Sequence, residues 1–226
     1  ALAREGGSFA LANNLLPLQG AALAPLCLQG LFNLTCVKNG YPGIDKVLRS
    51  FLSITQTERI DTREVAAKAL CNCARVFKLR LKMLDEGTVR VLTGVLAPAG
   101  KKKDGLQPVS WETKYAALVT LHRMASARAC RADMISKGVM KVLRETAARE
   151  SDGRLLLVAA ATLQNLAQDP NSKARVVKEG ALQVAAAALQ KGPTLADKAA
   201  EARLYWILAS ALHHLSRDPA CVPAMV

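Results

Sequence analysis

The six residues TLQNLA (162–167) recur along the chain in altered form, and this repetition decides the fold. Each copy has a small residue, then Leu, two variable residues, an apolar residue and a second small residue. The other copies are GLFNLT (30–35), ALCNCA (69–74), TLHRMA (120–125) and ALHHLS (211–216). We call the fourth residue of each copy the anchor, and the anchors are Asn33, Asn72, Arg123, Asn165 and His214. The anchors are 39 to 51 residues apart, and self-similarity at such a period is typical of stacked helical repeats.

A second marker repeats in step with the anchors. It is a Gly followed four and five residues later by two apolar residues, as in GIDKVL (43–48), GTVRVL (87–92), GVMKVL (138–143) and GALQVA (180–185). In three repeats this Gly follows its anchor by 15 residues. Insertions at 97–110 and near 190–198, and a shortened segment around NGYPG (39–43), explain the uneven anchor spacing. Stacked repeats tolerate such length changes between helices.

Each repeat is expected to contain three helices. The first is short and ends at the marker Gly, because glycine adopts the left-handed backbone that closes a helix. The second is amphipathic, and the third is the longest and most apolar, so we expect the third helices to form the core. The clearest examples are 78–86, 131–137 and 173–179 for the first helix, 139–148 and 181–189 for the second, and 154–167 and 200–216 for the third.

The markers predict a single array. Its approximate repeats are 1–35, 36–74, 75–125, 126–167 and 168–216, with 217–226 beginning a further repeat. ALAREGG (1–7) aligns with the end of a first helix, and DPACVPAMV (218–226) aligns with DPNSKARVV. A repeat array needs capping repeats to cover its terminal apolar faces, and neither end carries one. We therefore expect the sequence to be an internal piece of a longer array.

The pattern resembles the armadillo repeat over essentially the whole chain. The resemblance is carried by residues 162–185, in which TLQNLA leads into DPNSKARVVKEGALQVA, and by ALCNCA followed by a DEG turn. The two-helix HEAT repeat is the alternative, but a short first helix ending in EG or KG favours armadillo. The resemblance implies an all-α solenoid, a right-handed superhelix of three-helix repeats. It also implies a scaffold for protein–protein interaction rather than an enzyme.

The anchor Asn has two interpretations. The Leu two residues before the anchor and the apolar residue one after it share a helix face, which should point to the core and leave the anchor at the groove edge. In the armadillo family, Asn residues at this position bind the backbone of an extended peptide, and Asn33, Asn72 and Asn165 match them. Alternatively, the amide joins its own helix to the neighbouring repeat. Arg123 and His214 depart from the pattern, which weakens a uniform peptide ladder in their repeats.

One branch of the family is disfavoured. Import adaptors of the importin α type carry Trp four residues before the anchor, where it forms pockets for a basic signal. In this chain those positions are Gln29, Lys68, Val119, Ala161 and Ser210. None is Trp, and a basic signal would also meet a strongly basic protein.

The groove is instead predicted to be basic, and in this it is similar to the groove of β-catenin, which takes acidic extended segments. Basic residues stand at or near the anchor register, and Tyr115 and Trp206 stand eight residues before an anchor. Core packing or a solvated face remains the alternative for any one of them. The predicted partner-binding residues are Asn33, Lys68, Asn72, Arg75, Tyr115, Arg123, Asn165, Trp206, His214 and Arg217.

Charge points to acidic partners. The formal net charge is +13 over 226 residues and the isoelectric point is about 9.8. Such a charge attracts acidic protein segments, and the alternative partner is a polyanion such as nucleic acid or a microtubule or axonemal surface. Aromatic residues are only 4% of the chain and scattered, and no base-reading module is present, so nucleic acid is disfavoured. A filament or ciliary assembly is one form of the scaffold hypothesis.

The remaining chemistry argues against an enzyme, a cofactor or a metal site. Cys71 and Cys73 would point to nearly opposite faces of a helix, so they are not a zinc half-site. The six cysteines are expected to be free thiols in a reducing compartment, which predicts a cytoplasmic protein. No Ser, Cys or carboxylate stands with a base in a catalytic motif. The uncharged stretch 6–37 is interrupted by Asn, Gln, Pro and Gly, so no membrane span is expected.

Overall fold

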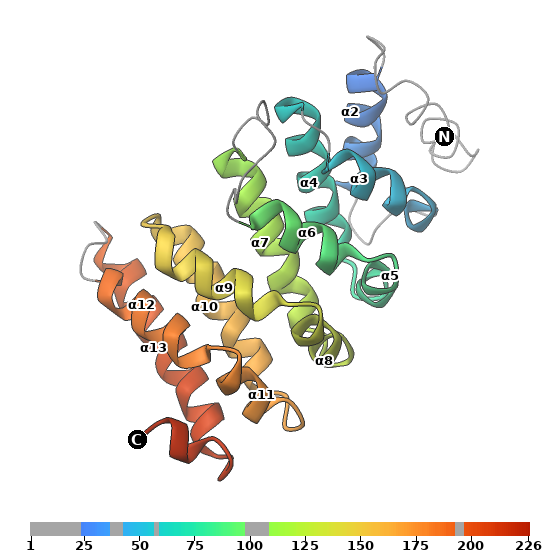
Figure 1. Ribbon diagram of the computed structural model, residues 1–226. Coiled ribbons are helices and arrows are strands. Elements are labelled where there is room, and N and C mark those ends of the chain that lie inside the picture. Colours follow the sequence, from blue (N-terminus) through green and yellow to red (C-terminus); the bar gives the residue numbers. More distant parts are fainter. Residues whose placement is uncertain (1–23, 37–42, 57–58, 98–108, 193–196) are drawn as a thin grey trace. The chain divides into compact units, whose positions relative to one another are not determined.

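The computed structural model describes residues 24–36, 43–56, 59–97, 109–192 and 197–226 (Figure 1). Every regular element in these ranges is helical. The chain divides into two compact units, Ala1–Thr120 and Leu121–Val226, and the division falls within helix α7. The fold is the predicted one, an all-α armadillo-type helical repeat solenoid.

The helices follow the predicted order of a short first, an amphipathic second and a long third helix. The helices that begin in the first unit are α2 Ala24–Thr35, η1 Ile44–Val47, α3 Leu48–Ile54, α4 Ile60–Cys73, α5 Leu79–Asp85, α6 Thr88–Leu96 and α7 Trp111–Ala125. Those of the second unit are α8 Arg128–Ser136, α9 Val139–Arg149, α10 Gly153–Ala167, α11 Lys173–Lys178, α12 Ala181–Lys191, α13 Lys198–Ser216 and η3 Val222–Ala224. The third helices α2, α4, α7, α10 and α13 each end one or two residues after their anchor.

The marker glycines are the left-handed turns that the sequence predicts. Gly43, Gly87, Gly138 and Gly180 have φ values of 86°, 82°, 84° and 106°. Each stands directly before a second helix or, at Gly43, before the short 3₁₀ helix that leads into α3. A residue with a Cβ strains this conformation, which explains why glycine recurs at this place in these four repeats.

Aspartate side chains begin two of the third helices. The Asp152 carboxylate accepts hydrogen bonds from the backbone N–H groups of Arg154 and Leu155 at the start of α10. Asp197 accepts one from Ala199 at the start of α13. Such caps accept hydrogen bonds from backbone N–H groups that have no partner within the helix, and they fix where these two third helices begin.

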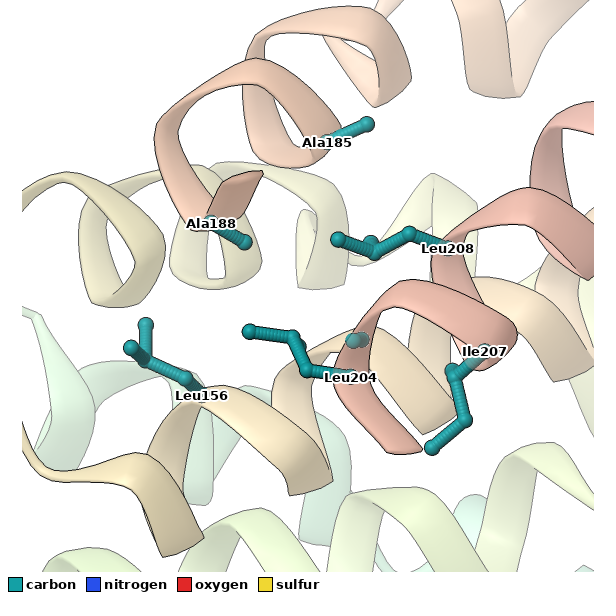
Figure 2. Packing of buried hydrophobic residues seen from close by; sticks show 7 residues of the cluster. Leu156, Ala185, Ala188, Leu204, Ile207 and Leu208 are labelled. Atoms are coloured by element: carbon teal, nitrogen blue, oxygen red, sulfur yellow. The ribbon is translucent and has the colours of Figure 1, made fainter. Parts of the chain in front are cut away.

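One core cluster of the second unit is formed mainly by leucine and alanine from neighbouring repeats. Leu156 of α10 and Leu204 of α13 are fully buried, and Figure 2 shows Leu204 extending toward Leu156, with Ala188 of α12 nearby. The small side chains Ala185 and Ala188 let α12 lie close to this pair. In the first unit, Phe51 is fully buried and is among the largest core side chains. The low aromatic content is therefore compatible with a well-packed core, because alanine permits close helix approach.

Several predictions concern residues outside the described ranges. They are the start of the first repeat, the segment NGYPG up to residue 42, the insertion at 98–108 with its three lysines, and the insertion at 193–196. The repeat boundaries themselves stay a prediction. Within the described residues, no helix has the length and apolar character needed to cross a membrane.

Candidate functional site

The anchor Asn72 joins two third helices of the first unit. Its Nδ2 donates to Thr35 Oγ1 of α2 at 3.1 Å and lies 3.5 Å from Cys36 Sγ. Thr35 is buried, and its hydroxyl donates in turn to the Phe32 carbonyl at 2.6 Å. This chain of hydrogen bonds connects α4 to the C-terminal end of α2, so the Asn72 amide has a partner within the fold.

Asn165 makes a longer contact of the same kind in the second unit. Its Nδ2 lies 3.4 Å from His122 Nδ1 and 3.5 Å from the His122 carbonyl oxygen, near the end of α7. These distances are at the upper limit of a hydrogen bond, so this contact is weaker than that of Asn72. Asn33 differs, because its Oδ1 accepts from Gln29 Nε2 of the same helix at 3.1 Å. Contact with a ligand stays a prediction for all three.

Lys68 is held by a residue that the sequence reasoning missed. Its Nζ forms an ion pair with Glu64, one turn earlier on α4. Glu64 also accepts a hydrogen bond from Ser110 Oγ at 3.3 Å, just before α7. The spacing of four residues between Glu64 and Lys68 is a recognisable sequence signal for such a pair. The charge of Lys68 is therefore partly balanced at its own surface.

The two predicted aromatic residues differ in exposure. Tyr115 is half-buried and stacks on Trp111, with ring centroids 5.0 Å apart and planes 12° apart. Trp206 is 68% exposed on α13. One turn after Trp206, Ser210 Oγ accepts a hydrogen bond from Gln164 Nε2 of α10 at 2.7 Å. The second unit thus places an exposed indole next to a polar contact between two third helices.

Basic groups gather near the C-terminal end of α13. His214 is half-buried, and burial lowers its pKa, with further lowering by the charges of His213, Lys173, Arg217 and Arg131. Arg217 follows α13 and is exposed. His214 therefore lies among positively charged side chains.

The last two predicted residues lie near the ends of their third helices. Arg75 is exposed in the turn after α4, where its backbone N–H donates to the Asn72 carbonyl at 3.0 Å. Arg123 is half-buried near the end of α7. In the first unit the structure thus brings Lys68, Asn72 and Arg75 to the C-terminal half of α4 and the turn after it. Trp206, His214 and Arg217 belong to α13 and the residue after it.

Two arginines with a shared role were not singled out from the sequence. Arg80 Nε donates to the Ala74 carbonyl at 2.8 Å, and Arg131 Nε donates to the Ala125 carbonyl at 2.9 Å. Each arginine stands eight residues after its anchor, and each carbonyl lies at the end of a third helix. Arg131 is buried, and desolvation lowers its pKa while nearby Asp169 opposes the shift. The signal for this shared role was in the sequence, because Arg80 and Arg131 stand the same number of residues after their anchors.

Three features of the described residues bear on metal and nucleophilic chemistry. No group of three or more His, Cys, Asp or Glu side chains could hold a metal ion in that part of the chain. A cavity of about 700 Å³ in the first unit includes Arg63, Glu86 and Arg90 among its described lining residues, which contain no His, Cys or Ser. Burial raises the pKa of the Cys73 thiol to about 12, so this cysteine is not a reactive thiolate at neutral pH.

Comparison with known proteins identifies the fold. No protein-family model and no curated protein sequence matches the chain. A designed armadillo repeat protein in complex with the peptide (KR)4 has a TM-score of 0.73 at 17% identity, covering 95% of this chain and 84% of that chain. Computationally designed armadillo repeat proteins for modular peptide recognition give 0.68 at 17% identity, with 91% and 82% covered. An engineered protein gives 0.71 at 21% identity, with 94% and 80% covered. The chain therefore has the fold of the armadillo repeat proteins.

Proposed function

We propose that this protein is a non-catalytic scaffold that binds extended segments of partner proteins on the exposed faces of its third helices. The observation that carries the proposal is Trp206, which is 68% exposed eight residues before its anchor. Leaving a large apolar ring in water is unfavourable, and tryptophan is enriched among the residues that contribute most to protein interfaces. A partner covering Trp206 would gain this burial.

Polar groups beside Trp206 suit the backbone of an extended segment. Such a backbone presents alternating N–H donors and carbonyl acceptors, which must find partners when they are buried. Ser210 and Gln164 lie at the contact between α13 and α10, and a Gln amide can both donate and accept. Asn165 and Asn72 use Nδ2 for their contacts within the fold, so a ligand N–H group would donate a hydrogen bond to their Oδ1.

The partner segment is expected to be acidic. One structural neighbour is in complex with the peptide (KR)4, a basic sequence. The net charge of +13 on this chain would repel such a peptide, and exposed Arg75 and Arg217 would attract carboxylates. The likeness in fold therefore supports peptide binding, while the charge argues for the opposite sign of ligand. A cytoplasmic setting within a cytoskeletal or ciliary assembly stays a prediction.

Peptide selection tests this function. Immobilised chain would select peptides from a random library at about 0.15 M salt, where long-range charge effects are screened. Fluorescence anisotropy would then give the Kd of selected peptides for the parent chain, for Trp206→Ala and for Lys68→Glu combined with Arg75→Glu. We expect acidic peptides, and a loss of about tenfold or more with Trp206→Ala.

The matched control is Leu189→Ser. Leu189 is another exposed apolar residue of the second unit, 40% exposed on the second helix α12. It should leave the Kd unchanged, and circular dichroism would establish that each variant is folded. Selected peptides that bind both third-helix variants as tightly as the parent would refute the proposal. A random-sequence DNA duplex that binds more tightly, with a steep salt dependence, would favour the polyanion alternative.

A further inference from the structure

A second exposed apolar surface lies on a first helix, outside the third helices considered above. Phe77, in the turn before α5, is 65% exposed, and Leu81 within α5 is 47% exposed. Phe77 stands two residues before α5 begins and Leu81 lies in its first turn, so both exposed apolar side chains belong to the start of the same helix. We call these two residues with Arg75, Lys78 and Arg80 the Phe77 patch.

The Phe77 patch departs from the pattern of the other repeats. Phe77 stands five residues after its anchor, and Leu81 stands nine residues after it. The equivalents of Phe77 are Arg128, Pro170 and Pro219, and those of Leu81 are Ala132, Ala174 and Pro223. Among these four repeats, only that of α5 therefore combines two large apolar side chains at these positions. The repeat fold does not require them, since the other repeats form without them.

The Phe77 ring is held in place before any partner arrives. The Arg80 guanidinium carbon lies 5.1 Å from the ring centroid, and Arg80 Nε is fixed by the Ala74 carbonyl at 2.8 Å. Backbone hydrogen bonds of 3.0 Å, from Val76 N to Cys73 O and from Leu79 N to Val76 O, close the turn. A preorganised aromatic side chain loses little conformational entropy on binding, so more of its burial contributes to affinity.

The charges around the ring define the partner. Every charged residue within four positions of Phe77 is basic, namely Arg75, Lys78 and Arg80. Arg75 and Lys78 are exposed, and the nearest carboxylate in the sequence is Asp85 at the far end of α5. An apolar centre with a basic rim is complementary to a segment that carries apolar residues flanked by carboxylates.

We propose that the Phe77 patch is a docking site for an acidic segment of a partner protein, whose apolar residues cover Phe77 and Leu81. This site shares Arg75 with the third-helix surface of the proposed function, but its apolar centre, Phe77 and Leu81, lies outside that surface, and the proposal does not depend on that function. A scaffold with both sites could hold two partner segments at once. The basic rim would speed association, and the apolar pair would determine how long the complex lasts.

Three matched peptides test the proposal with the whole chain. The first alternates Glu with Leu and Phe, the second replaces each Glu with Lys, and the third keeps Glu but replaces the apolar residues with Ser. Anisotropy titrations would be run on the parent chain, on Phe77→Ser, on Leu81→Arg, and on Phe77→Ser combined with Trp206→Ala. Leu189→Ser is the control, and Trp206→Ala alone reports binding on the third helices. Both patch residues are exposed, and circular dichroism would establish folding.

The first peptide should bind the parent chain at least about tenfold more tightly than the other two, and Phe77→Ser or Leu81→Arg should remove about that factor. Leu189→Ser should change nothing, and Phe77→Ser should remove the same factor from a chain that already carries Trp206→Ala, because the two sites lie on different helices. Unchanged binding to both patch variants, or equal binding of the Lys peptide, would overturn the proposal. A loss seen only with Trp206→Ala would place the peptide on the third helices. A dimer in sedimentation that Phe77→Ser abolishes would show instead that a second copy covers the patch.

Discussion

Replacing the buried Arg131 tests how the end of a third helix is stabilised. Arg131 Nε donates to the Ala125 carbonyl at 2.9 Å, and its Nη2 donates to Gln168 Oε1 at 3.3 Å. The last carbonyl groups of a helix lack partners within it and carry the negative end of the helix dipole. Arg131→Met keeps most of the side-chain volume but leaves the Ala125 carbonyl without this donor.

Two opposing effects set the magnitude. A hydrogen bond from a charged group contributes about 1.5–3 kcal/mol, and its loss leaves a buried acceptor and the nearby Asp169 without the cation. Against this, Arg131 is only 8% exposed, so its removal relieves the desolvation that lowers its pKa. Removing one partner of a buried charged interaction usually costs more free energy than the relieved desolvation returns. We expect a net loss of about 2 kcal/mol, or roughly 4–8 °C in Tm for a chain of this size.

Thermal unfolding followed by far-UV circular dichroism measures this change. Arg128→Met is the matched control, because Arg128 is exposed on the same helix and its loss changes the net charge equally. Arg131→Lys should recover only part of the loss, since an ammonium group cannot reproduce the planar fork of a guanidinium. If Arg131→Met melts at the same temperature as Arg128→Met, the desolvation relieved equals the bonding lost, and the reasoning is wrong.

Four further substitutions have defined outcomes. Leu204→Ala should cost about 2–5 kcal/mol of unfolding free energy by denaturant titration, because Leu204 is fully buried, and a cost below that of an exposed leucine would contradict the packing described. Gly138→Ala should lower the free energy of unfolding by about 1–2 kcal/mol, because its φ of 84° strains any residue with a Cβ. Gly180→Ala should lower it further, because a Cβ there would also lie 3.2 Å from Arg144 Nη1. Equal melting temperatures of the two variants would contradict this reasoning. Burial and neighbouring cations lower the pKa of His214 in the folded chain, so the unfolded chain binds the proton more readily. The free energy of unfolding should therefore be highest above the usual pKa of 6.5 and should fall as the pH drops through the lower pKa of the folded state. His214→Gln should flatten this part of the curve of unfolding free energy against pH.

The sequence predicts the helices well because their determinants are local. Leu163 and Leu166 flank their anchor three residues apart, and both are buried as that spacing requires. Gly138 and Gly180 mark turns that other residues enter only with strain. The limits of α8 were less clear, since it begins at Arg128 rather than Arg131. The residues before Arg131 include alanine and carry no Gly or Pro to stop the helix, so the boundary had no strong signal.

The candidate site is harder to predict because its contacts join distant residues. Asn72 and Thr35 are 37 residues apart, and the register that aligns their helices does not say which atoms meet. Trp206 and Tyr115 hold the same position relative to their anchors, yet one is exposed and the other stacks on Trp111. Exposure at one position therefore depends on neighbours that differ between repeats. The pairing of Lys68 with Glu64 is the exception, because both lie on one helix.

An anchor Asn could both join neighbouring third helices and bind a ligand, and the contacts of Asn72 and Asn165 favour the first role. An Asn that clamps a ligand needs an amide that can adjust to it, whereas Asn72 and Asn165 direct Nδ2 to the preceding third helix. The exposed indole of Trp206 lies two turns before its anchor, and exposed Arg75 and Arg217 lie three residues after theirs. Residues that hold the stack together cannot vary freely with the ligand, but residues on either side of them can. Selectivity for a partner should therefore depend more on these flanking positions than on the anchor amides, and at Asn72 and Asn165 a peptide ladder would contribute affinity mainly through Oδ1.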